Sequence, residues 1–68
     1  MDAATLEMVL TAFEETREES LAQGKSGDDA TKEALVAAAM CLSAMTGVED
    51  AEARAQIEAL NPLKRLAA

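Results

Sequence analysis

The residues whose type and spacing most readily suggest chemistry are four glutamates near the N-terminus. They form two pairs whose members are four residues apart, which places each pair on one side of a helix. These residues are Glu14, Glu15, Glu18 and Glu19. Carboxylates on facing helices bind di-iron centres, but those centres also need Glu-x-x-His partners, and the chain has no histidine. A loosely held magnesium or calcium ion is an alternative, yet we expect no metal site and no cofactor.

The four glutamates have two other interpretations. A run of charge is commonly a solvated helix face, and like charges four residues apart repel each other. The same face could dock on the basic surface of another protein, because long-range attraction speeds encounter. We take docking as the working hypothesis, with solvated surface as its alternative.

Other reactive residues in the sequence do not assemble into a catalytic motif. Gly24-Lys25-Ser26 resembles the end of a phosphate-binding loop, but that motif needs a glycine where Glu19 stands, and a preceding strand. Ser26 beside Lys25 lacks any third group that would orient a nucleophile and its base. Cys41, the single cysteine, lies in an apolar segment without a nearby positive charge, so we expect it to serve packing. The sequence therefore predicts a protein that is not an enzyme.

The charge balance excludes several classes of partner. Thirteen acidic residues face six basic ones, giving a net charge of −7. Six of the acids and one base, Arg17, fall within residues 1–22, and the adjacent basic residues Lys64 and Arg65 lie near the C-terminus. Nucleic-acid-binding proteins cluster Lys and Arg instead, so we expect binding neither to nucleic acid nor to a membrane. One cysteine and no basic-then-apolar leader favour a reducing compartment, and we expect a cytoplasmic protein.

The elements that must position these residues are helices. The apolar period and the turn residues predict one all-α domain over residues 1–68, with helices at about 3–22, 28–46 and 49–60 and a short turn at 62–67. On the first helix, apolar residues from Leu6 to Leu21 fall within one face. Gly24 and Gly47 stand where left-handed residues end helices. Ser26, Asp28 or Asp29 could cap the second helix.

The second helix is apolar over most of its surface. One stripe of large and small side chains faces a core. A second stripe, spaced like a coiled-coil contact but built only from small side chains, we call the small seam: Ala30, Ala34, Ala37, Cys41 and Ala44. Small side chains allow helix backbones to approach closely. The small seam is therefore predicted to lie in a helix-packing contact, either within the chain or in a dimer.

Large apolar side chains are scarce for a chain of this length. Sixteen of the 68 residues are alanine, and Phe13 is the single aromatic residue. A core of this kind stabilises a monomer only marginally, and neither a disulfide nor a histidine-containing zinc site is available. We therefore expect a three-helix bundle, or a helical hairpin with a third helix, that is completed by homodimerisation.

The functional prediction is a small acidic interaction module, bacterial or from a phage, that self-associates and docks on a partner protein. The alternative is a nucleic-acid mimic that inhibits a protein with a basic groove. Leu66-Ala67-Ala68 resembles the Ala-Ala ending of the bacterial transfer-messenger tag, which AAA+ unfoldases read. An alanine-rich helix end explains the same residues, and both interpretations stay open.

Overall fold

The computed structural model describes the backbone of residues 1–67 and the side chains of residues 1–65. The interpretation of Leu66-Ala67-Ala68 as a degradation signal therefore falls outside the described side chains. The described part of the chain is all-helical: α1 (Ala3–Ala22), α2 (Gly27–Thr46), α3 (Asp50–Leu60) and α4 (Pro62–Ala67). α1 has the expected bounds, α2 begins one residue earlier than expected, and α3 begins one residue later.

The helix ends follow from local side-chain chemistry. The Asp2 carboxylate accepts the N–H of Thr5 at 2.8 Å and caps α1. Of the three possible caps of α2, the structure selects Ser26, whose hydroxyl accepts the N–H of Asp29 at 3.1 Å. Gly47 follows α2 with φ of 78°, a left-handed conformation in which glycine has no steric penalty. This turn is closed by the hydroxyl of Ser43, which donates to the carbonyl of Val48 at 2.7 Å.

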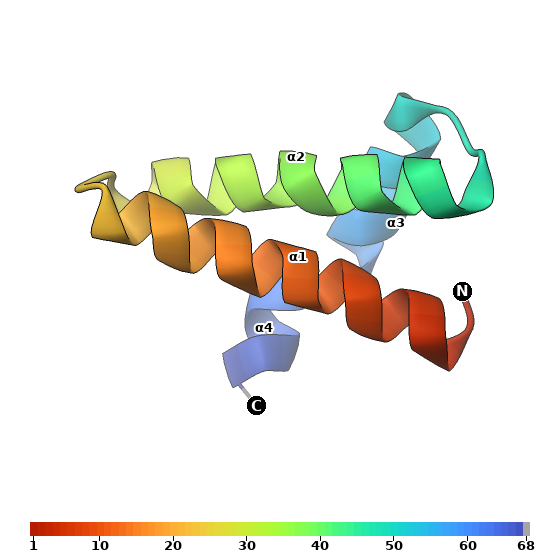
Figure 1. Cartoon of the computed structure of the whole chain (residues 1–68), viewed down its shortest axis with the longest axis horizontal. Coiled ribbons are helices and arrows are strands. Elements are labelled where there is room, and N and C mark those ends of the chain that lie inside the picture. Colours follow the sequence, from red (N-terminus) through yellow and green to blue (C-terminus); the bar gives the residue numbers. More distant parts are fainter. Residues whose placement is uncertain (68) are drawn as a thin grey trace.

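α1 and α2 form an antiparallel hairpin that is closed at one end and open at the other (Figure 1). The two helices lie close together beside the turn that joins them, and they diverge toward the start of α1 and the end of α2. The chain then bends by 118° after α2, so α3 and α4 pass behind the hairpin. α3 contacts α2, whereas α4 contacts both α1 and α3.

The core lies where the first three helices meet. α1 contributes Val9 and Phe13, and α3 contributes Ala53 and Ile57, all with no exposed surface. α2 contributes Leu42 and three alanines: Ala34, Ala38 and Ala39. Four large side chains therefore fill the centre, and alanines allow the helices to approach around them. The expected packing of three helices is confirmed.

One apolar residue of α1 lies where the sequence pattern did not place it. Leu21 is 39% exposed, so it does not share the buried face of Val9 and Phe13, although the apolar period places all three on one face. Its neighbour Ser20 takes the buried position, at 5% exposure, and its hydroxyl donates to Glu33 of α2 at 2.6 Å. One residue along a helix turns the side chain by about 100°, which directs Leu21 toward solvent.

Within residues 1–67, no single helix has both the length and the apolar composition to cross a membrane, and one bent pair meets that test only jointly.

Candidate functional site

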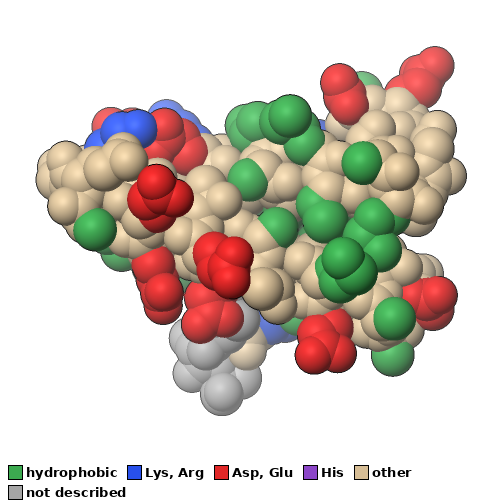
Figure 2. All heavy atoms as spheres, viewed as in Figure 1, with side chains coloured by type: hydrophobic (Ala, Val, Ile, Leu, Met, Phe, Trp, Pro, Cys, Tyr) green, Lys and Arg blue, Asp and Glu red, His purple; other side chains and the backbone are tan. Residues whose placement is uncertain are grey.

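A groove of about 460 Å³ lies between α1 and α2, where the hairpin opens. Figure 2 shows apolar side chains gathered over this part of the hairpin, with acidic side chains along the outer edge of α1. Six residues of α1 and one of α2 line it: Ala4, Glu7, Met8, Thr11, Ala12, Glu15 and Cys41. Met8 is 54% exposed and forms the largest apolar part of the wall. We call this the hairpin groove.

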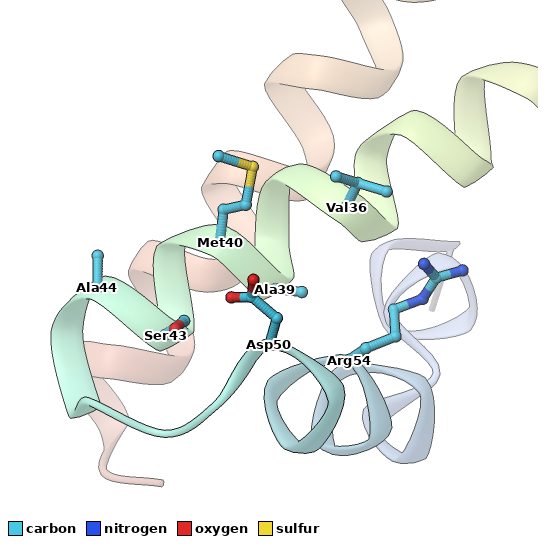
Figure 3. Close-up of a pocket in the computed structure, with 7 residues that line it drawn as sticks. All are labelled: Val36, Ala39, Met40, Ser43, Ala44, Asp50 and Arg54. Atoms are coloured by element: carbon cyan, nitrogen blue, oxygen red, sulfur yellow. The ribbon is translucent and has the colours of Figure 1, made fainter.

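A second groove, of about 450 Å³, lies on the other side of α2, against α3. Its α2 wall carries Val36, Met40 and Ala44, which are spaced four residues apart and form one ridge along the helix (Figure 3). Val36 is 47% and Met40 is 63% exposed. Asp50 and Arg54 of α3 stand at its other wall, so this surface carries one charge of each sign. We call it the α2 ridge surface.

The four glutamates singled out in the sequence are all exposed on α1. Glu15 lines the hairpin groove, whereas the other three are not among the residues that line it. Glu15 therefore shares the hairpin groove with Glu7, and not with the other three glutamates.

The small seam divides along its length. Ala30 and Ala34 are fully buried beside α1, near the closed end of the hairpin. Ala37 and Cys41 are half-buried, and Ala44 is exposed. This gradient follows the divergence of α1 and α2. The first two residues serve packing within the chain, while Cys41 and Ala44 reach the hairpin groove and the α2 ridge surface respectively.

The other candidate reactive residues have structural partners. The Ser26 hydroxyl is exposed and serves as the cap of α2. Lys25 Nζ binds Glu33 Oε1 at 2.5 Å. The Cys41 thiol lies 3.8 Å from Met45 Sδ, one turn further along α2. Among the described residues, no group of three His, Cys, Asp or Glu side chains is arranged to hold a metal ion.

Polar contacts hold the closed end of the hairpin together. Arg17 Nε of α1 donates to the hydroxyl of Thr31 on α2 at 3.1 Å. Glu33 of α2 accepts from both Ser20 and Lys25. The Lys25 ammonium, and after it the Ser20 hydroxyl, hold the pKa of the Glu33 carboxyl below its ordinary value.

The lowered pKa of Glu33 predicts a pH-dependent contribution to stability. Because the unfolded chain binds the proton more readily, this contribution is full above the unfolded pKa of about 4 and is lost as pH falls through the folded pKa. We expect Glu33→Gln to lower the melting temperature at neutral pH, and the difference from wild type to shrink at strongly acid pH. Thermal denaturation over a pH series measures this. Glu19→Gln, which also removes one charge, is the control. If the melting temperatures of Glu33→Gln and wild type differed by the same amount at every pH, the stabilising role of ionised Glu33 would be contradicted.

No protein-family model, curated protein or solved structure gives a significant match to this chain. The class of the protein, a small acidic helical bundle, therefore rests on its own sequence and structure.

Sequence reasoning missed the hairpin groove. Its α1 wall is a second row of residues spaced four apart, Ala4, Met8 and Ala12, beside the row that forms the core. The detectable signal was that Val9 and Phe13 already fill the inward face, which leaves Met8 on a neighbouring one.

Proposed function

We propose that this chain is a protein–protein interaction module without enzyme activity, which pairs with a second copy and docks on a partner protein. The observation that carries the proposal is the uncovered apolar surface of α2. No charged residue occurs between Ala34 and Thr46, and Val36 and Met40 project from the helix with about half or more of their surface exposed. A helix that is apolar nearly all round is typical of a bundle interior or a subunit interface.

The α2 ridge surface suits a second copy. Its single acidic and single basic residue, Asp50 and Arg54, are self-complementary, since a twofold axis brings a surface against itself. Arg54 Nε also binds Glu58 Oε1 at 2.9 Å within α3, which holds the guanidinium beside the groove. Burial of the ridge would extend a core that has four large side chains at its centre.

The docking half of the proposal is supported by α1. Its acidic residues are exposed, and the apolar residues Met8 and Ala12 lie between Glu7 and Glu15 on the hairpin groove. A mimic of nucleic acid needs rows of charge without this apolar interruption, so we place the interaction module before the mimic. The single cysteine favours a reducing compartment, and we propose that the module works in a bacterial cytoplasm, its own or that of a phage host.

The test of self-association is the mass of the protein in solution. We expect sedimentation equilibrium at tens of micromolar to give a dimer of the 7.1 kDa chain. Met40→Glu should give a monomer with unchanged helix content, because it places a charge in the interface and Met40 touches the fold little. Leu21→Glu, an equal charge on an exposed leucine of α1, should leave the dimer intact. A wild-type monomer that melts cooperatively would overturn the self-association.

A further inference from the structure

The shape of the hairpin groove fits a helix. Ala4, Met8 and Ala12 form a straight row along about 12 Å of α1, which is about two helical turns. The two alanines permit close backbone approach, and the methionine between them adapts to the shape of an apolar partner. Cys41 stands opposite this row on α2. A helix that lies between α1 and α2 would run along the opening of the hairpin and pack on both, as neighbouring helices do in a bundle.

The charge of the groove defines the polar side of that occupant. Glu7 and Glu15 line it, and no Lys or Arg is among its lining residues. The one basic residue of α1, Arg17, is bonded to Thr31 outside the groove. A second copy placed here would bring Glu7 and Glu15 against the same residues of its twin, and like charges in contact disfavour a complex. The second copy is suited instead to the α2 ridge surface, where both signs of charge are present.

We infer that the hairpin groove binds an amphipathic helix of a partner protein, with its apolar face on Met8 and Cys41 and with Lys or Arg residues beside Glu7 and Glu15. This inference rests on the proposed docking function and names the chemistry of the partner. In recognition of this kind, the partner's apolar residues bind the groove at helical spacing. The partner's basic residues set its orientation and the rate of encounter.

The groove contains its own reporter, because Cys41 is the only cysteine in the chain. The probe is a synthetic Leu–Lys peptide patterned as an amphipathic helix, compared with a scrambled peptide of the same composition and charge and with a Leu–Glu peptide of the same pattern. We expect the patterned Leu–Lys peptide to bind the full chain at least tenfold more tightly than either control, and to slow alkylation of Cys41 by iodoacetamide several-fold.

Two pairs of substitutions separate the groove from general attraction between charges. Glu7→Gln with Glu15→Gln should weaken binding of the Leu–Lys peptide about tenfold at low salt, mainly through the association rate. Glu14→Gln with Glu18→Gln removes the same charge from α1 outside the groove and should change binding less than twofold. Met8→Ser should speed dissociation and leave the salt dependence as in wild type.

Three results would overturn the inference: equal binding of the scrambled peptide, equal weakening by the two glutamate pairs, or tight binding without protection of Cys41. Sedimentation equilibrium on the same samples keeps this separate from self-association. An intact dimer with any of these results refutes the helix-binding groove alone. A monomer that binds none of the three peptides refutes the proposed function as well.

Discussion

Replacing Phe13 with alanine is expected to destabilise the protein by about 3–5 kcal/mol, the largest effect of any single substitution considered. Phe13 has no exposed surface and is the largest fully buried side chain, in contact with a core drawn from three helices. Four of the other seven buried residues in this core are alanines, which have no side-chain freedom with which to fill the space left behind. A domain of this length has a total stability on the order of 5 kcal/mol, so much of the Phe13→Ala chain should be unfolded at room temperature.

Urea denaturation followed by far-ultraviolet circular dichroism measures this effect, with protein concentration held equal for all variants because association adds to stability. Phe13→Leu, which keeps most of the volume, should cost much less. Leu21→Ala removes a large apolar side chain from an exposed site and should cost less than about 1 kcal/mol. A Phe13→Ala chain nearly as stable as wild type would show that the core is centred elsewhere.

The second large effect is expected from Ala34→Leu. Ala34 has no exposed surface and belongs to the core with Val9 and Phe13 of α1, so the added carbons would have to displace packed neighbours. Overpacking of this kind costs about 1–3 kcal/mol. Ala37→Leu, one turn further along the small seam, should cost less because the Ala37 side chain is only half-buried.

The control for this series is Ala55→Leu, on the exposed side of α3, which should change stability by no more than about 0.5 kcal/mol. Thermal denaturation at two protein concentrations separates loss of folding from loss of association. If Ala37→Leu were more damaging than Ala34→Leu, and made melting independent of concentration, the part of the small seam that begins at Ala37 would be a contact between subunits.

Much of this fold could be predicted from the sequence because its signals are local. The helical period of Val9 and Phe13 identified the inward face of α1, and Ser26 and Gly47 marked helix ends through their own backbone chemistry. The exposure of Leu21 could not be predicted in the same way. Ser20 and Leu21 are neighbours in the last turn of α1, and the buried position belongs to the serine. The choice depends on Glu33, which lies across the hairpin and accepts from Ser20.

The candidate surfaces could be predicted only in part, since they depend on the angle between helices. The sequence indicated an acidic α1 and a small seam on α2. It could not indicate that α1 and α2 diverge, which buries Ala34, exposes Ala44 and places Glu15 on the same groove as Cys41. No local pattern encodes that divergence, because the angle between two helices depends on how side chains distant in sequence pack against each other.

The order of contacts in this bundle also has a consequence for how quickly the chain reaches its native state. α1 packs mainly on α2, and α2 on α3, so the principal contacts join helices that are neighbours in sequence. Short turns join these helices, and little loop-closure entropy must be overcome before stabilising contacts form. Topologies dominated by such near-neighbour contacts fold in microseconds to milliseconds. We therefore expect the hairpin to form early, with its polar contacts at the closed end, and α3 to complete the core afterwards.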